Sequence, residues 1–575
     1  MRFVAAFALG IATLAASACR PSGTSSLDAR RVEAGPAIPR GGNLVVSVRA
    51  DPRSFNRLVA SDTSTDLVST LTQAKLVRIN KATQEVEPSL AESWTRSADG
   101  LRYTIKLRPD VAFADGQPFT SADVVFTFQA VYDENTRSVL ADALEAGGKQ
   151  LRVAAIDAHT VEVAFAEPFA AGIRLLDNLP MLPRHKLEPA LQAGTLAKAW
   201  NLSTPPSEMP GVGPFVLADY QPGQHLVFTR NPRYFGRGAD GRPLPYLDRI
   251  TVEIVPDQNA ELLRLEAGQI DMMTSEVGLQ AYAPLKRAAD EGRIRLIDLG
   301  VGYTANSLWF NLKPGAFGRD PRAAWLQHDG LRRAISLAVD RKTFADTVYF
   351  GAGVPVYGPE TEANRKWHWA GLPRTPHDPR AAQQALSAIG LIDRNGDGTL
   401  EDSRGQPVRF MLLTQKGRPD LERGASVIRD ELRKIGVLVD VVALEFSAVV
   451  ERIMSARYEA AYFSPSTTDT DPALNLDFWF SSGSLHIWNM SQQTPATEWE
   501  RRIDELMTRQ VASLDEAERK RLFDRVQEIF AEHLPVVHFV APRIYVAASS
   551  RVTNLSPALS RPQLLWTPET VAVIK

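Results

Sequence analysis

The residues that could bind a metal ion gather in one acidic segment, 393–401. Oxygen-bearing side chains stand at its positions 1, 3, 5 and 9 and a glycine at position 6, which is the spacing of the first part of an EF-hand calcium loop. Position 12, where such a loop carries a bidentate glutamate, is Arg404. A polar turn between a helix and a strand explains the segment as well. We favour the turn and keep Asp393, Asn395 and Asp397 as weak candidate calcium ligands.

Motifs for catalysis are missing from the sequence. It contains no G-x-S-x-G, no Walker loop and no H-E-x-x-H, and its nine histidines are scattered. Gly211-Val212-Gly213 lacks the third glycine of a dinucleotide-binding loop and runs directly into Pro214. We therefore expect a protein that binds its ligand without converting it, and that uses no cofactor.

The N-terminus predicts secretion. Arg2 precedes an apolar run over residues 3–15, which is too short to span a bilayer permanently, and small residues lead to Cys19, the only cysteine. A lone cysteine directly after a small-residue cleavage site resembles a bacterial lipobox. The usual lipobox prefers leucine where Ala16 stands, so ordinary cleavage is the alternative. We expect residues 1–18 to be removed as a signal peptide, and a periplasmic or extracytoplasmic protein that is anchored to a membrane through lipidated Cys19.

Composition limits the partners. Residues 19–40 are polar and rich in small residues, which predicts a flexible tether. Loss of the signal removes only Arg2 from the charge balance, so the net charge changes from −2 to −3. That value does not favour nucleic acid as a partner. The remaining chain is longer than one hydrophobic core usually serves, so we expect two or more lobes.

Strand and helix patterns alternate beyond the tether. Residues 101–108 alternate apolar and polar side chains, and apolar pairs flank the turn at 221–224, which predicts a hairpin. Thr120 or Ser121 is placed to cap a helix. A helical stripe over 428–435 is followed by Gly436 and an alternating strand. This order predicts an α/β protein.

Five stretches resemble extracellular solute-binding proteins of family 5, which include the dipeptide- and oligopeptide-binding proteins of bacterial ABC importers. They occur in the order of the family and span nearly the whole mature chain. The stretches are 88–126, which contains FADGQPFTSADVVF; 213–215 with 231–235; LEAGQID at 265–271; LRRAISLAVDR at 331–341; and 535–537 with 552–555.

The resemblance implies a bilobal α/β fold of the periplasmic-binding-protein type, in the class with an extra inserted subdomain and a two-segment hinge. In this family the first lobe is built from both ends of the mature chain. We therefore expect lobe one to comprise residues 41–303 and 540–575, with the inserted subdomain at 59–185. Lobe two is expected to comprise residues 304–539.

The resemblance also directs attention to one loop. In peptide-binding relatives a Trp and an Asp follow a Tyr-Asp strand, and the Asp holds the ammonium group of the peptide. Residues 458–463 match that strand, and an ungapped comparison puts Pro465 at the Trp and Thr468 at the Asp. Asp469 lies one position further on, and we expect it to accept the ammonium group. Asp471 matches a scaffold position of the family.

Aromatic residues crowd the segment after this loop, at 478–480, 488 and 499. Each alone is expected to be a core residue. As a set near the cleft they are candidates for ligand contact, because aromatic faces beside amides suit sugar rings and peptide side chains. The candidate ligand-binding residues are Asp469, Thr468, Tyr462, Ser464, Trp479, Trp488 and Asn489.

These observations predict a monomeric substrate-binding lipoprotein that binds di- or oligopeptides between two lobes and delivers them to the permease subunits of an ABC importer. Three alternatives stay open: the same role with an oligosaccharide or another polar solute, an envelope hydrolase on the same fold, and a sensor subunit.

Overall fold

The computed structural model describes residues 38–464 and 469–574, and they form a mixed α/β protein. The signal peptide, Cys19 and most of the expected tether lie outside these residues, as do Pro465 and Thr468. In the described part of the chain, no helix combines the length and apolar character needed to cross a membrane.

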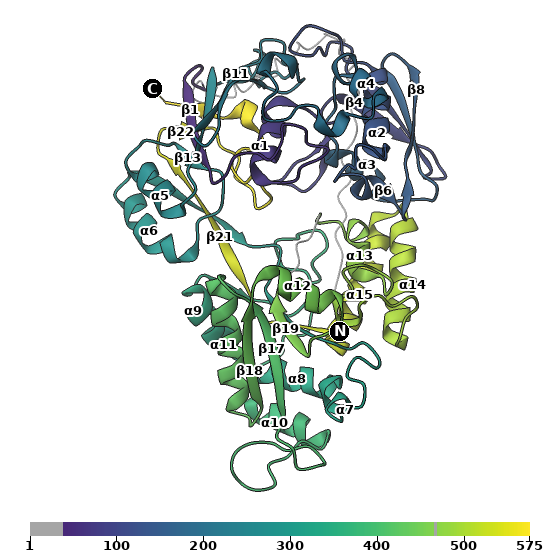
Figure 1. Ribbon diagram of the computed structural model, residues 1–575, viewed down its shortest axis with the longest axis vertical. Coiled ribbons are helices and arrows are strands. Elements are labelled where there is room, and N and C mark those ends of the chain that lie inside the picture. Colours follow the sequence, from purple (N-terminus) through teal and green to yellow (C-terminus); the bar gives the residue numbers. More distant parts are fainter. Residues whose placement is uncertain (1–37, 465–468, 575) are drawn as a thin grey trace, which may run out of the picture. The chain divides into compact units, whose positions relative to one another are not determined.

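An eight-stranded sheet joins segments from both ends of the chain (Figure 1). Its order is β10-β11-β12-β1-β13-β21-β14, with β16 paired to β21. The central strand β1 runs parallel to β12 and β13, and the other pairs are antiparallel. The strands are β1 (Asn43–Val48), β10 (Phe215–Gln221), β11 (His225–Arg230), β12 (Arg249–Ile254), β13 (Met272–Met273), β14 (Ile294–Val301), β16 (Gly353–Pro355) and β21 (Val540–Ser549). The predicted hairpin is confirmed as β10 and β11.

A separate four-stranded antiparallel sheet has the order β4-β5-β9-β8. The predicted alternating strand is confirmed as β5, whose inward residues are buried. The predicted cap is confirmed at α2, where the Asp123 carboxylate accepts the Thr120 N–H at 2.9 Å. The elements here are β2 (Val77–Ile79), β3 (Val86–Pro88), β4 (Ala91–Arg96), β5 (Arg102–Leu107), β8 (Arg152–Asp157), β9 (Thr160–Ala164), α1 (Thr63–Thr72), α2 (Ser121–Tyr132), α3 (Gly172–Leu175) and α4 (Arg184–Gln192).

A five-stranded sheet carries the later part of the chain, in the order β18-β17-β19-β15-β20. Strands β18, β17 and β19 are parallel, so their carboxyl ends meet at one edge. The predicted helix–glycine–strand unit is confirmed as α11 and β18, with Gly436 at φ +84° between them. The strands are β15 (Ser307–Phe310), β17 (Arg409–Gln415), β18 (Leu438–Leu444), β19 (Ala460–Phe463) and β20 (Val536–His538).

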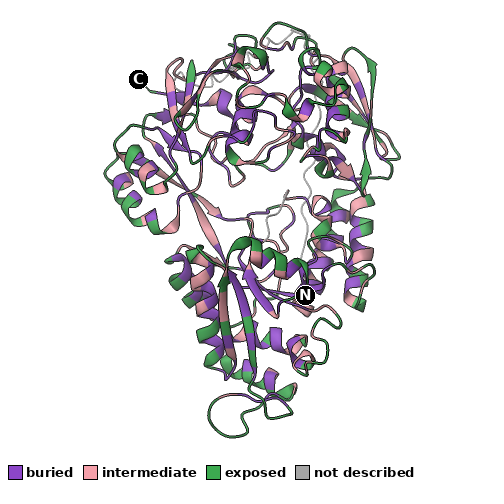
Figure 2. Cartoon of the chain, in the orientation of Figure 1, coloured by how far each residue is buried: buried purple, intermediate pink, exposed green. Residues whose placement is uncertain are grey.

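Amphipathic helices pack against this sheet and bury their apolar faces, as Figure 2 shows. The longer ones are α8 (Asp329–Ala338), α9 (Arg341–Tyr349), α10 (Pro379–Ala388), α11 (Pro419–Arg433), α12 (Phe446–Met454), α14 (Glu498–Ala512) and α15 (Glu516–His533). Four further helices are α5 (Gln258–Glu266), α6 (Tyr282–Asp290), α7 (Ala323–Leu326) and α13 (Leu476–Trp479). Near the C-terminus, β22 (Val552–Thr553) pairs with β23 (Ala572–Val573).

Two short connections join the large sheets. Strand β14 ends at Val301 and β15 begins at Ser307, while β20 ends at His538 and β21 begins at Val540. Strand β16 lies far along the chain and still pairs with β21 of the eight-stranded sheet. The expected lobe boundaries stay a prediction.

Candidate functional site

Polar contacts connect the region of the four-stranded sheet with the later part of the chain, and we call them the polar seam. On one side the seam contains Gln84, from the β2–β3 turn, and Arg174, from α3; on the other it contains Glu360, Ala363, Asn364 and residues 469–471. Gln84 Nε2 donates to the Ala363 carbonyl oxygen at 2.8 Å and to Tyr303 Oη at 3.0 Å. Arg174 Nη1 donates to the Gln84 carbonyl oxygen at 2.7 Å, which fixes the guanidinium toward the later segment.

Asp469 forms an ion pair with Arg174 in the seam. The Arg174 Nη2 and Nε atoms lie 2.8 and 3.2 Å from Asp469 Oδ1, and the two side chains are only 10 % and 13 % exposed. The Asp471 N–H also donates to Oδ1, at 2.8 Å. Desolvation by burial raises the pKa of the Asp469 carboxyl, and the Arg174 charge opposes that rise. Among the described residues no donor contacts Oδ2, which leaves that oxygen for a further partner.

Asp471 is held by Arg519, from α15. Arg519 Nη2 donates to Asp471 Oδ1 at 2.5 Å, and Arg519 Nη1 donates to Asp471 Oδ2 at 3.1 Å. Asp471 Oδ1 also accepts the Ala473 N–H at 3.0 Å. The Arg519 guanidinium lies over the Trp367 ring, 4.7 Å from its centroid. Both oxygens of Asp471 are therefore used within the protein, as the scaffold role implied by the resemblance requires.

Glu360 is an acidic residue that sequence reasoning missed. Its carboxylate accepts one hydrogen bond, at Oε2 from Asn364 Nδ2 at 2.7 Å, and no described residue forms an ion pair with it. Asn364 Nδ2 also donates to the Thr470 carbonyl oxygen at 2.8 Å, so this amide joins Glu360 to the loop that carries Asp469. Glu360 belongs to no recognisable sequence motif. Only the tertiary contacts of the folded chain place it in the seam.

The other candidate ligand residues lie in different surroundings. Tyr462, Trp479, Trp488 and Asn489 are buried, with exposed fractions of 3 % or less. Trp488 and Trp479 belong to one core cluster together with Ile503 and Phe530. Contact with a ligand would require these side chains to leave the core, so the core interpretation accounts for them. Ser464 follows β19 and is half-buried, and Thr468 lies outside the described residues.

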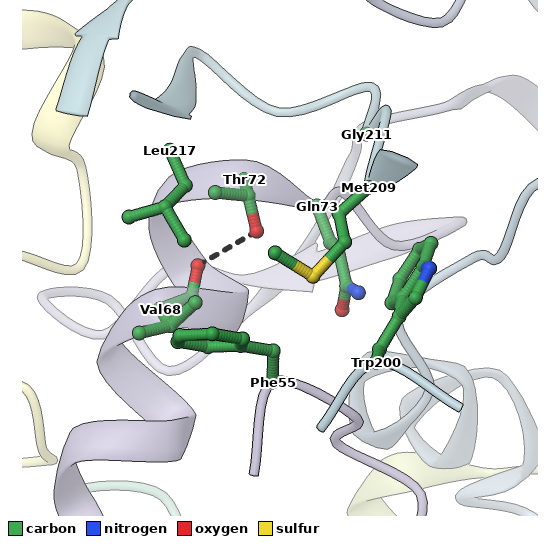
Figure 3. Close-up of a pocket in the computed structure, with 8 residues that line it drawn as sticks. All are labelled: Phe55, Val68, Thr72, Gln73, Trp200, Met209, Gly211 and Leu217. Atoms are coloured by element: carbon green, nitrogen blue, oxygen red, sulfur yellow. Dashed lines mark hydrogen bonds between the residues drawn. The ribbon is translucent and has the colours of Figure 1, made fainter. Parts of the chain in front are cut away.

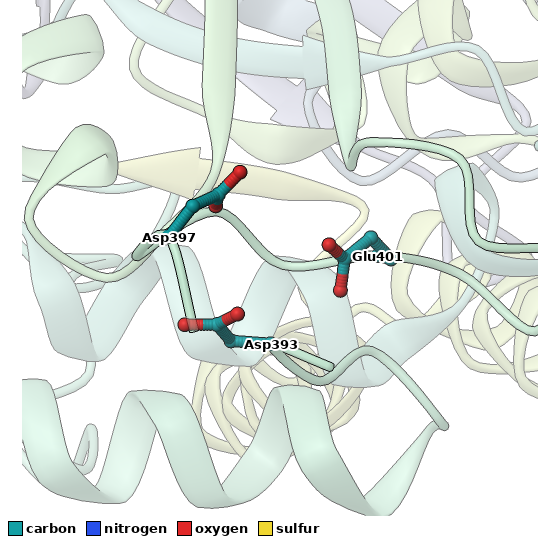
Figure 4. Close-up of side chains that lie close together, drawn as sticks. All are labelled: Asp393, Asp397 and Glu401. Atoms are coloured by element: carbon teal, nitrogen blue, oxygen red, sulfur yellow. The ribbon is translucent and has the colours of Figure 1, made fainter. Parts of the chain in front are cut away.

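The acidic loop brings three carboxylates together (Figure 4). One oxygen each from Asp393, Asp397 and Glu401 lies within 4.8 Å of the others. Backbone N–H groups of the loop already donate to all three: Gly396 to Asp393 at 2.7 Å, Thr399 to Asp397 at 2.7 Å and Arg394 to Glu401 at 2.7 Å. Asn395 Nδ2 donates to Asp397 at 3.1 Å. These bonds are those of a polar turn, the interpretation that we favoured, and calcium binding there stays the alternative hypothesis.

Gly211 lines a small pocket in the first part of the chain (Figure 3). The pocket is lined by Phe55, Trp200 and Met209 among others, and its volume of about 10 Å³ suits one water molecule. A Cβ atom on Gly211 would lie 1.8 Å from the Thr72 carbonyl oxygen, so the close approach of two backbones requires glycine there.

One serine–histidine contact bears on the hydrolase alternative. Ser307 Oγ lies 2.8 Å from His538 Nδ1, between β15 and β20, and both residues are buried. Burial, together with the nearby Arg341 charge, lowers the pKa of His538 to about 3. A histidine with that pKa is a weak base, and among the described residues no carboxylate contacts its other ring nitrogen, Nε2, as a catalytic triad requires.

The sequence and the fold match a known family. The sequence model of bacterial extracellular solute-binding proteins, family 5 Middle, matches residues 85–485. The chain is 26 % identical to a probable ABC transporter-binding protein of Deinococcus radiodurans, over 97 % of this chain and 95 % of that protein. It is 27 % identical to the oligopeptide-binding protein AppA of Bacillus subtilis, over 92 % and 91 %.

The solved structure of Bacillus subtilis AppA in complex with a nonapeptide superimposes with a TM-score of 0.69 at 25 % identity, and the match covers 94 % of this chain and 100 % of that one. The predicted bilobal α/β fold of periplasmic binding proteins is thereby confirmed. The relatives are substrate-binding transport proteins and not enzymes. The chain belongs to family 5 of the bacterial extracellular solute-binding proteins, which serve ABC transport outside the cytoplasm.

Proposed function

We propose that this protein captures peptides between its two lobes and delivers them to an ABC permease, from a membrane anchor at Cys19. The observation that carries the proposal is the carboxylate of Asp469. In the loop after β19 this carboxylate is desolvated, held by Arg174 through Oδ1 and without a described donor at Oδ2. An ammonium group that leaves water needs such a partner, because an unpaired buried charge is very costly.

Arg174 has a defined part in this proposal. It keeps the Asp469 carboxylate oriented and balances its charge when no ligand is present. The same contact joins the two sides of the seam, so it stabilises the arrangement in which they meet. Residues 302–306 and Phe539, which connect the two large sheets, are the hinge in this proposal, because few dihedral angles need to change there. The lobes are then 41–303 with 540–575, and 304–539.

The experiment that tests the peptide proposal starts from the purified protein as it is isolated. Small molecules released on denaturation are identified by mass spectrometry, and synthetic copies are titrated back by calorimetry. Released peptides that rebind support the proposal. Release and rebinding of a neutral sugar, with no peptide bound, would contradict it.

A further inference from the structure

The charges of the seam do not balance. Asp469 is paired with Arg174 and Asp471 with Arg519, at 2.8 and 2.5 Å. Glu360 has no cation beside it among the described residues, so these five side chains carry one negative charge in excess when all of them are ionised. Of these five side chains, Glu360 is the carboxylate without a counter-charge among the described residues.

The hydrogen bonds around Glu360 leave acceptors without donors. Asn364 is 2 % exposed, and its Nδ2 donates to Glu360 Oε2 at 2.7 Å and to the Thr470 carbonyl oxygen at 2.8 Å. Two acceptors on one nitrogen fix the orientation of the amide. Within the described residues, Asn364 Oδ1 is then buried without a partner and Glu360 Oε1 receives no donor. Such acceptors suit a group that brings several N–H donors.

Glu360 is partly removed from water, although it is not fully enclosed. It is half-buried, so solvent still reaches part of it. Desolvation nevertheless raises the pKa of its carboxyl to about 7; the Asn364 amide opposes the rise and the Asp471 charge adds to it. Glutamine could accept the same Asn364 hydrogen bond without this cost, so a purely structural role does not require a carboxylate here.

We propose that Glu360 is a ligand-binding carboxylate that accepts a cationic group of the solute, an ammonium or a guanidinium, and that the protein therefore selects positively charged ligands. The inference rests on the proposed function, because it assumes that the solute lies in the seam. The cationic group could belong to the amino terminus of a peptide or to a lysine or arginine side chain.

The test compares wild type with Glu360→Gln and with the control Glu362→Gln, which changes an exposed carboxylate in the same segment. Probes are alanine pentapeptides with lysine or norleucine at each position in turn, and the same peptides with an acetylated amino terminus. The lysine-for-norleucine arm reports on a side chain and the acetylation arm on the terminal ammonium. Calorimetry gives the dissociation constants, and melting curves verify that each variant is folded.

We expect wild type to bind at least one charged peptide tenfold or more tightly than its neutral counterpart. Glu360→Gln should reduce that ratio below threefold, and Glu362→Gln should leave it unchanged. At pH 7 binding to wild type should release up to about half a proton, measured in buffers of different ionisation enthalpy, because the cation restores the ionised carboxylate in the molecules that are protonated. Glu360→Gln should abolish this release.

Two results would overturn the role of Glu360 while leaving the peptide function intact: wild type that binds peptides without preference for charge, and Glu360→Gln that keeps the preference. If wild type binds none of the peptides, the proposed function fails. Glu360 is then judged on the solute released from the purified protein, where a cationic molecule supports its role and a neutral or anionic one excludes it.

Discussion

Replacing Asp469 by asparagine tests the peptide site most directly. The substitution keeps the shape of the side chain and an oxygen that can face Arg174, and it removes one negative charge. If the ligand's ammonium group binds at Oδ2, the variant leaves that ammonium and the Arg174 guanidinium close together without a counter-charge. The lost attraction is therefore joined by a repulsion between like charges.

The structure sets the size of the effect. The Asp469 side chain is 13 % exposed and its partner Arg174 10 %, so water screens the charges weakly. Loss of one partner from a desolvated charge pair costs about 3–5 kcal/mol. This corresponds to a weakening of at least about a hundredfold in the peptide dissociation constant.

The assay is a calorimetric titration of wild type, Asp469→Asn and the control Asp477→Asn, whose carboxylate is exposed in the same segment. Each protein is titrated with one peptide in its free and its N-acetylated form. Acetylation should weaken binding to wild type by less than Asp469→Asn does, because it leaves no second cation beside Arg174. In Asp469→Asn acetylation should cause no further weakening, since the interaction it removes is already lost. Binding of the free peptide to Asp469→Asn within about threefold of wild type would refute the assignment of Asp469.

Three further predictions follow from the other features. Cys19→Ala should move the protein from the membrane fraction to the soluble fraction, and an unchanged fraction would contradict lipidation. A chelator should shift the melting temperature little, because the acidic loop satisfies its carboxylates with backbone N–H groups and lacks a glutamate at position 12; a loss of several degrees that calcium restores would make Asp393 and Asp397 ligands. The folded-state pKa of Glu360 lies above its ordinary value of 4.5, so ligand-free wild type should lose stability as the pH rises from about 4.5 to about 7. Glu360→Gln should remove this loss, which is on the order of 3 kcal/mol, so the two proteins should melt alike at pH 5 and the variant should melt higher at pH 8.

Local patterns in the sequence predicted local structure well. The alternation over 101–108 became β5, the turn at 221–224 became the β10–β11 hairpin, and Thr120 with Asp123 caps α2. Each of these depends on residues within a few positions of one another, because periodicity, turns and caps are interactions between near neighbours. The resemblance to family 5 extended these predictions to the fold as a whole.

The candidate site was predicted less completely. Asp469 was identified from the strand before it, but nothing near it in the sequence indicates that its partner is Arg174, 295 positions away. The sequence of the aromatic residues at 478–499 does not tell whether they line a cleft or fill a core. The packing of the folded chain decides this, and it leaves Trp488 only 1 % exposed. Glu360 has no motif at all.

The sequence by itself therefore determined the α/β class, the order of the elements and the family, since these follow from short-range patterns and from stretches shared with relatives. The tertiary structure decided which charges meet. Arg174 and Arg519 each neutralise an aspartate from a distant part of the chain, and Glu360 is left without a cation. The physical reason is that the energy of a charge depends on what surrounds it in space, and the surroundings are set by segments that come together only on folding.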